Sequence, residues 1–176
     1  MSEPFKFSTQ VRVRFNETDA QGHVNFAHYL SYFDVALTDY LRAIGYTYLQ
    51  MLADDVDMLY VGTQTRYVSP AYFEEVLNIH AHTGHIGHSS VRFEFQVFAN
   101  ADRRAVAEGS ITVVMVERAT RRKISVPARL REAVAGFENR PPLEDDDWIR
   151  SAATKAGAPE GEGDRYDMEP YGFCGG

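Results

Sequence analysis

The sequence predicts an α+β fold, a single domain in which a curved antiparallel β-sheet wraps around a long central α-helix. Residues 26–44 carry apolar side chains at helical spacing, and several later segments alternate between apolar and polar residues as strands do. A sheet that curls around such a helix buries its broad apolar face. One layer of this kind leaves apolar surface and edge uncovered, so we expect the chain to form at least a dimer.

The elements are predicted in chain order from the same two periodicities. Residues 9–16 are predicted to form a half-buried strand, with Val11, Val13 and Phe15 on one side. The long helix is predicted to end at Gly45. The apolar face of that helix comprises Phe26, Tyr29, Leu30, Phe33, Ala36, Leu37, Tyr40, Leu41 and Ile44. The remaining predicted elements are a short helix at 47–53, strands at 58–68, 75–84, 89–99 and 105–117, a short strand at 123–126, and a helix from Pro127 to Phe137.

Composition divides the chain into two parts. Residues 1–138 hold 14 Lys+Arg against 16 Asp+Glu. Residues 139–176 hold 4 against 9, together with four of the seven prolines and six of the thirteen glycines. We therefore predict a globular domain over 1–138 and a flexible, acidic, Pro/Gly-rich tail over 139–176.

Charge and hydropathy exclude several classes of function. A domain of nearly balanced charge lacks the basic face that nucleic-acid binding requires. The apolar runs are shorter than the roughly 18 residues that span a membrane, and the N-terminus has no signal-peptide pattern. The single cysteine, Cys174, can form no intrachain disulfide. We expect a cytoplasmic protein with no nucleic-acid partner and no membrane span.

The segment between the first strand and the long helix, Glu17–Asn25, carries the candidate chemistry. Asp19 provides a carboxylate, Gly22 allows an unusual turn, and Asn25 is a candidate N-cap. A helix that begins at Phe26 offers unpaired N–H groups that can polarise a carbonyl oxygen, and a nearby carboxylate can attack the carbonyl or activate a water. The same residues can also form a capped loop that performs no chemistry.

The stretch Val13–Asn25, VRFNETDAQGHVN, and its continuation Tyr29–Asp34 resemble the signature of hotdog-fold acyl-CoA thioesterases. The similarity is to the 4-hydroxybenzoyl-CoA thioesterase branch, which includes the Tol-Pal-associated acyl-CoA thioesterases. Tyr67–Pro70 and Gly87–Ser90 fit the same pattern, and the resemblance covers residues 8–137. It implies an enzyme that hydrolyses a short- or medium-chain or aromatic acyl-CoA to the free acid and CoA, with no cofactor.

The resemblance also implies roles for single residues. It places the catalytic carboxylate, a nucleophile or a general base, at Asp19. The amide that polarises the carbonyl matches the backbone N–H of Phe26, where family members often have Tyr or His. The run Asp19-x-x-x-His23-Val24-Asn25 is also similar to plant acyl-ACP thioesterases, so His23 either assists catalysis or orients its neighbours. Gly22 and Asn25 are predicted to contribute to substrate binding.

For the phosphates of CoA, the resemblance implies strand-borne Arg and Ser groups at a dimer interface within a homotetramer. The candidates are Arg66, His88, Ser89, Ser90 and Arg92. Each arginine can instead be an ordinary surface residue. The histidines at 80, 82, 85 and 88 are interpreted as surface or interface residues and not as metal ligands, because no cysteine or nearby carboxylate joins them.

Two other functions compete with hydrolysis. The same fold can serve as a non-catalytic module that binds acyl-CoA or acyl-ACP, with its tail recruiting a partner. It can also serve as a hydratase or dehydratase, although the His/Asp pair which that chemistry uses cannot be located in the sequence. The aromatic residues of the long helix, including Phe26, Tyr29, Tyr32 and Phe33, either line an acyl pocket or belong to the core.

Overall fold

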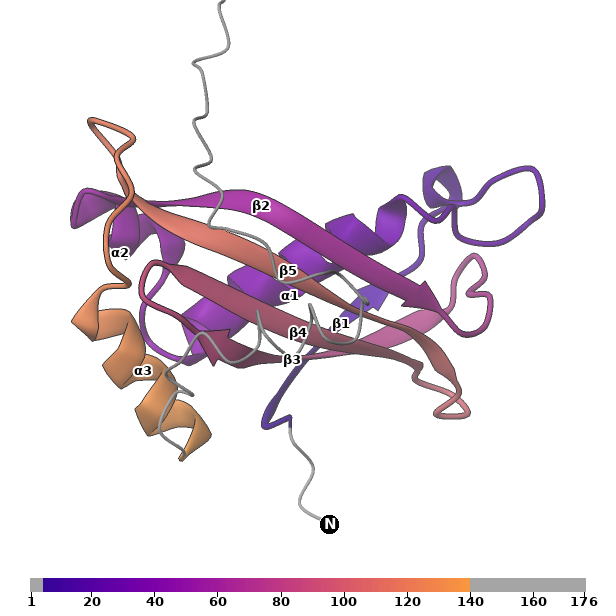
Figure 1. Cartoon of the computed structure of the whole chain (residues 1–176). Coiled ribbons are helices and arrows are strands. Elements are labelled where there is room, and N and C mark those ends of the chain that lie inside the picture. The colour runs from indigo at the N-terminus through magenta and orange to yellow at the C-terminus, as the bar shows by residue number, and fades with distance from the viewer. Residues whose placement is uncertain (1–4, 140–176) are drawn as a thin grey trace, which may run out of the picture. The chain divides into compact units, whose positions relative to one another are not determined.

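A five-stranded antiparallel sheet curves around one long helix in the computed structural model, which describes residues 5–139 (Figure 1). The predicted α+β class is thereby confirmed, and the predicted tail lies outside the described residues except for Asn139. The strands lie in the spatial order β1-β3-β4-β5-β2, so β1 and β2 are the sheet edges. In chain order the elements are β1 (Phe7–Arg12), the 3₁₀ turn η1 (Phe15–Glu17), α1 (His28–Ala43), α2 (Tyr48–Ala53), β2 (Val56–Tyr67), β3 (Val76–Ile86), β4 (Ser90–Ala99), β5 (Ala105–Glu117) and α3 (Ala128–Glu138).

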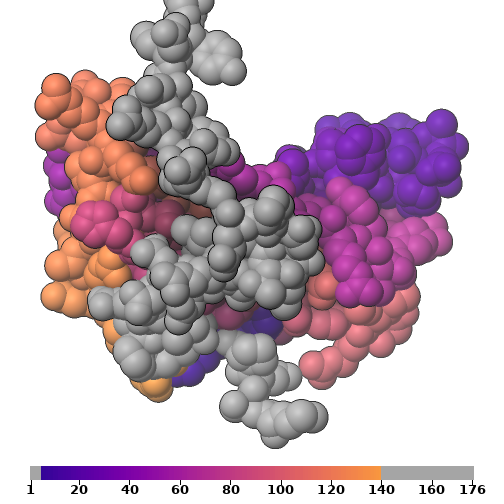
Figure 2. All heavy atoms as spheres, in the orientation of Figure 1, coloured from indigo at the N-terminus to yellow at the C-terminus, as the bar shows by residue number. Residues whose placement is uncertain are grey.

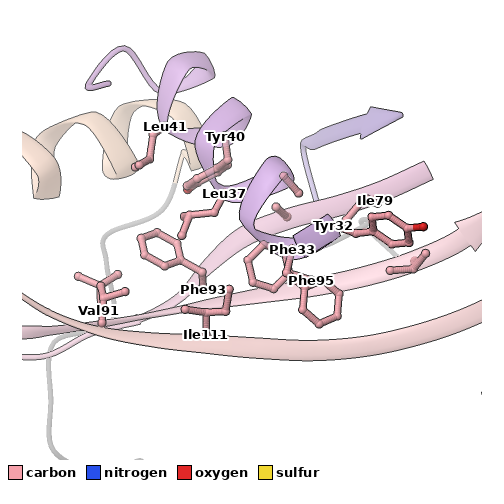
Figure 3. Packing of buried hydrophobic residues seen from close by; sticks show 14 of the residues in the cluster. Tyr32, Phe33, Leu37, Tyr40, Leu41, Ile79, Val91, Phe93, Phe95 and Ile111 are labelled. Atoms are coloured by element: carbon pink, nitrogen blue, oxygen red, sulfur yellow. The ribbon is translucent and has the colours of Figure 1, made fainter. Parts of the chain in front are cut away.

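Helix α1 packs its apolar face against the inner face of the sheet (Figure 3). The rings of Phe33 on α1 and Phe95 on β4 stack with centroids 4.8 Å apart and planes 13° apart. At the other end of the helix the buried Tyr40 hydroxyl lies 2.9 Å from the Thr83 hydroxyl and donates to the Glu138 carboxylate. The buried side chains of α1 are Tyr29, Tyr32, Phe33, Ala36, Leu37, Tyr40 and Leu41.

The close approach of α1 to the sheet requires a glycine on β5. A Cβ placed on Gly109 would lie 2.5 Å from the Gln64 carbonyl oxygen and 2.6 Å from the Phe33 ring. Both distances are shorter than real Cβ contacts, so a larger residue must push apart β2, β5 and the helix. The Phe33–Phe95 stack therefore depends on the absence of a side chain at this position.

Strand β2 is a long edge strand with an apolar surface. Its 12 residues pair only with β5 among the described strands, with a register shift between Tyr60 and Gly62. Tyr60, Val61, Tyr67 and Val68 are each about half exposed on or directly after this strand. An unpaired edge that carries exposed apolar side chains is a surface suited to strand pairing.

Two sequence-based boundaries at the start of the domain are wrong. The first strand ends at Arg12 instead of running to residue 16, and Phe15, expected beside Val11 and Val13 on the buried side, is 76% exposed in η1. The physical reason is Glu17, whose buried carboxylate accepts a hydrogen bond from the Arg14 N–H at 2.7 Å and turns the chain out of the strand.

The long helix begins at His28, two residues later than predicted, with Ala27 as its N-cap. Asn25 is therefore not the N-cap; its side-chain oxygen accepts from the Ala27 N–H at 3.0 Å in a turn that precedes the helix. Consequently Phe26 is 67% exposed, and Leu30 is also partly exposed, although both were predicted on the buried face.

The remaining elements agree closely with the predicted ones. Thr47 caps α2 through a hydrogen bond from the Gln50 N–H, and Pro127 is the N-cap of α3. The predicted short strand at 123–126 is reduced to one bridge between Lys123 and Val116. Among residues 5–139, no helix has the length and apolar character needed to cross a bilayer.

We predict that Gly109→Ala lowers the free energy of unfolding by about 1–3 kcal/mol, the usual cost of overpacking a core. Chemical denaturation followed by circular dichroism measures the change. Gly136→Ala is the matched control, because a Cβ at this position on α3 meets no atom within 4 Å and alanine is the better helix former. Equal stability of Gly109→Ala and the wild type would contradict the packing argument.

Candidate active site

A small closed loop holds the backbone of Asp19. Thr18 and Val24 form an antiparallel bridge, which closes the loop at its base. Inside it, the Asp19 N–H donates to the His23 carbonyl at 3.0 Å, and the Gly22 N–H donates to the Asp19 carbonyl at 2.9 Å. Gly22 has a φ of +80°, a backbone conformation that glycine adopts without strain. The prediction that Gly22 allows an unusual turn is therefore confirmed by its positive φ.

The Asp19 carboxylate is oriented by the loop and open to solvent. Its Oδ1 accepts a hydrogen bond from the Gln21 N–H at 2.8 Å, and its Oδ2 lies 3.9 Å from Nδ1 of His23. The side chain is 25% exposed. The His23 Nδ1 is 3.2 Å from the Val24 carbonyl oxygen, so a proton on Nδ1 can donate there and leave Nε2 as an acceptor.

Phe26 presents a backbone N–H that no acceptor within residues 5–139 receives. The next two amides are satisfied by Asn25: its side chain accepts from Ala27, and its carbonyl accepts from His28 at 3.0 Å. The Phe26 carbonyl accepts from the Tyr67 hydroxyl at 3.1 Å. The predicted polarising amide is therefore available, although it precedes the helix.

The three residues predicted as catalytic line one open depression with a volume of about 420 Å³. Figure 2 shows this end of the molecule, where indigo atoms of the loop adjoin magenta atoms from the end of β2. The depression is mostly apolar on the β2 side. Its lining residues are Asp19, Gln21, His23, Val24, Phe26, Tyr29, Tyr67, Val68, Ser69 and Pro70.

Glu17 supports the loop from beneath, a role that the sequence did not suggest. Its carboxylate is 1% exposed and accepts from the Arg14 backbone and guanidinium and, at 2.8 Å, from the Tyr32 hydroxyl. Burial by itself would raise the pKa of Glu17, but these hydrogen bonds outweigh it and hold the pKa below its usual value. The available signal was a glutamate three residues after Arg14, the N-cap of η1, because a glutamate at that position can accept from the N-cap backbone N–H.

The two arginines predicted to bind CoA lie on the outer face of the sheet. Arg92 alternates with the buried Val91 and Phe93 on β4 and therefore points away from α1. It pairs with Glu94 at 3.3 Å, and Arg66 pairs with Glu108 at 2.9 Å. Neither arginine lines the depression at Asp19.

The segment at 88–90 lies at the opposite end of the sheet from Asp19 within one protomer. The Ser89 carbonyl accepts from the Met115 N–H, and the His88 carbonyl accepts from the Val126 N–H. Strand β4 starts at this hairpin and runs ten residues, roughly 30 Å, toward the end where the loop lies. Within one protomer His88, Ser89 and Ser90 therefore do not line the depression at Asp19.

Two of the strand histidines, His82 and His85, are buried in the protomer, although surface or interface positions were predicted for them. Within residues 5–139, no group of three or more His, Cys, Asp and Glu side chains is arranged to hold a metal ion. His82 Nε2 lies 3.2 Å from the Glu94 carboxylate, and the rings of Phe5 and His82 meet edge to face at 4.4 Å.

Comparison with known proteins agrees with this geometry. The profile of the thioesterase-like superfamily matches residues 13–134, and the chain therefore belongs to that superfamily. A putative esterase of Aquifex aeolicus is 28% identical over 123 residues, which cover 70% of this chain and 93% of the relative. The acyl-CoA thioesterase YbgC of Haemophilus influenzae is 26% identical over 128 residues, which cover 72% and 93%.

A solved structure from Thermus thermophilus, a thioesterase complexed with coenzyme A and Zn, superposes with a TM-score of 0.69 at 29% identity. The match covers 79% of this chain and 98% of that one. The predicted hotdog architecture and the predicted enzyme class, a thioester hydrolase, are confirmed at the level of the superfamily.

We predict that Glu17→Gln lowers stability at neutral pH by about 1.5–3 kcal/mol, since it weakens hydrogen bonds to a buried charge. The lowered pKa of Glu17 fixes the sign of the pH effect. Its stabilisation is complete above the unfolded value of about 4.3 and is lost as pH falls through the folded pKa. Urea unfolding at several values between pH 7 and pH 3 should therefore show the two proteins converging in acid.

Glu108→Gln is the control for this pH series, because the Glu108 side chain is 46% exposed and pairs with an exposed arginine. A surface pair of this kind contributes about 0–1 kcal/mol. A constant stability difference between Glu17→Gln and the wild type at every pH would show that Glu17 is not the titrating group.

Proposed function

We propose that this protein is an acyl-CoA thioesterase in which Asp19 is the catalytic carboxylate. The observation that carries the proposal is that one depression is lined both by Asp19, whose carboxylate is partly exposed, and by Phe26, whose backbone N–H donates to no residue among 5–139. The amide is the donor for the carbonyl oxygen of the thioester, whose negative charge grows in the transition state. A carboxylate and an N–H donor in one depression with apolar lining residues suit attack on the carbonyl carbon of a bound thioester.

Two reaction schemes use these groups and balance. In one, a water oxygen bonds to the carbonyl carbon while Asp19 takes its proton; the C–S bond then breaks, and the proton passes to the CoA thiolate. In the other, an Asp19 oxygen bonds to the carbonyl carbon and expels the thiolate, and water then hydrolyses the mixed anhydride and restores the carboxylate. Both yield a free acid and CoA, and neither requires a cofactor.

The acyl group that this site favours is apolar or aromatic. Beyond Asp19 and His23 the depression is walled by Phe26, Tyr29 and Tyr67. The half-exposed Val68 extends the wall beyond the end of β2. The choice of CoA as the carrier is supported by the similarity to an acyl-CoA thioesterase and to a thioesterase that was solved with CoA.

We also propose that the enzyme is a dimer paired along β2, or a tetramer built from such dimers. Antiparallel pairing of two β2 edges covers the exposed side chains of Tyr60 and Val61 and satisfies the open strand edge. Pairing in this sense places the Asp19 end of one protomer beside the hairpin end of its partner. The candidates at 88–90 would then reach a CoA bound at Asp19 from the second copy.

We predict that Asp19→Asn lowers kcat/KM for acyl-CoA hydrolysis by roughly 10²-fold or more, because the amide can neither take a proton nor attack a carbonyl. A panel of acyl-CoAs assayed by released thiol measures this. Asp39→Asn is the matched control, since Asp39 is 33% exposed and lies on α1 away from the depression. Full activity of Asp19→Asn contradicts the assignment. Binding of acyl-CoA without any turnover by the wild type would instead support the non-catalytic module.

We predict that Val61→Lys shifts the protein from its oligomer toward monomers, because a lysine on an edge strand opposes strand pairing. Light scattering coupled to size-exclusion chromatography measures the mass. Leu49→Lys is the control, because it also replaces an exposed aliphatic residue with lysine but lies on α2 and not on the strand edge. The Leu49 side chain is 76% exposed. An unchanged mass for Val61→Lys, or a monomeric wild type, would refute pairing along β2.

A further inference from the structure

We propose that Tyr67 is a positioning residue that holds the Phe26 amide in place for catalysis. This inference rests on the proposed function, in which the Phe26 N–H polarises the thioester carbonyl. Tyr67 is the last residue of β2, 41 positions further along the chain, and its hydroxyl donates to the Phe26 carbonyl at 3.1 Å. Because the two residues are so far apart in the sequence, this contact cannot be recognised from the segment around Phe26 alone.

Phe26 needs an anchor because helix α1 does not hold it. The helix begins at His28, and the Leu30 N–H, which would bond to the Phe26 carbonyl in a longer helix, bonds to Ala27 at 3.3 Å instead. The Phe26 side chain is 67% exposed and contributes little packing. Among the described residues, the Tyr67 hydroxyl is the donor that occupies the Phe26 carbonyl.

Tyr67 is itself held on two sides. Its ring meets the buried ring of Tyr29 edge to face, with centroids 5.3 Å apart. Its backbone pairs with Ala107 on β5, and the following amides of Val68 and Ser69 both donate to the Val106 carbonyl. The hydroxyl therefore reaches from the end of β2 to the Phe26–Ala27 peptide, which is separated by one Cα from the Phe26 N–H and lies outside regular secondary structure.

The connection after Tyr67 also supports the Asp19 loop. The Val24 N–H donates to the Ala71 carbonyl at 2.8 Å, so the strand that closes the loop is tied to the β2–β3 segment. The Asp19 loop and Phe26 are thus both hydrogen-bonded to the end of β2 and the segment that directly follows it. A donor aimed at a developing oxyanion is effective only when it is held in advance, and a misplacement of about 1 Å can cost 10²-fold.

The test is Tyr67→Phe, which keeps the ring against Tyr29 and removes only the hydroxyl. We expect kcat to fall about tenfold while KM changes less than about twofold, since the lost contact acts mainly in the transition state. Tyr72→Phe is the matched control, because Tyr72 is also half exposed and its hydroxyl bonds to no residue in 5–139. Unchanged kcat in Tyr67→Phe overturns the proposal, as does a raised KM with unchanged kcat.

A second readout separates positioning from direct contact with substrate. The backbone amide signal of Phe26 in a ¹⁵N NMR spectrum, recorded without substrate, should shift or broaden in Tyr67→Phe and stay unchanged in Tyr72→Phe. An unchanged Phe26 signal together with reduced kcat would mean that the hydroxyl contacts the substrate, and would overturn positioning. Because this spectrum needs no turnover, it tests the contact between Tyr67 and Phe26 even if the wild type hydrolyses no acyl-CoA.

Discussion

The buried carboxylate of Glu17 is the interaction on which the geometry of the site depends. Its side chain accepts from Arg14, just after β1, and from Tyr32 on α1, while its backbone carbonyl accepts from the Asn25 N–H at 2.9 Å. It therefore joins the chain before the Asp19 loop, the end of the loop and the helix that follows. With these three points fixed, the loop between them has little freedom left, and Asp19 is presented in one orientation.

The other half of the site comes from the sheet and is set by the packing of α1. Gly109 lets the helix approach β5, and the stacked rings of Phe33 and Phe95 hold that distance. The distance between α1 and β5 in turn affects the position of the start of α1 relative to the end of β2, where the Tyr67 hydroxyl donates to the Phe26 carbonyl. Phe26 offers no polar side chain, so the proposed polarisation at this position would rest on a backbone group whose direction is set by its surroundings.

Hydrophobic periodicity was sufficient to predict the helix at the centre, the positions of the main strands along the chain and the antiparallel sheet. It was insufficient at Phe15 and Phe26, because both lie where a local hydrogen bond, from Arg14 to Glu17 or from Ala27 to Asn25, overrides the pattern. The prediction that Asp19 is the catalytic carboxylate came from the resemblance of its segment to a known signature. Tyr67 could not be assigned a role from sequence, since its contact is created only when the sheet and the helix come together.

The pairing order of the strands has a consequence for the order in which the site is built during synthesis. The hydrogen bonds that close the Asp19 loop join residues within a single short stretch of chain. Strand β2, in contrast, has only β5 as its partner among the described strands of the protomer, and Tyr67 faces Ala107. A nascent chain can therefore close the loop early, but it cannot seat Tyr67 until β5 has left the ribosome. The contacts within the Asp19 loop are therefore local in sequence, whereas the contact between Tyr67 and Phe26 joins residues 41 positions apart and depends on the last strand of the sheet.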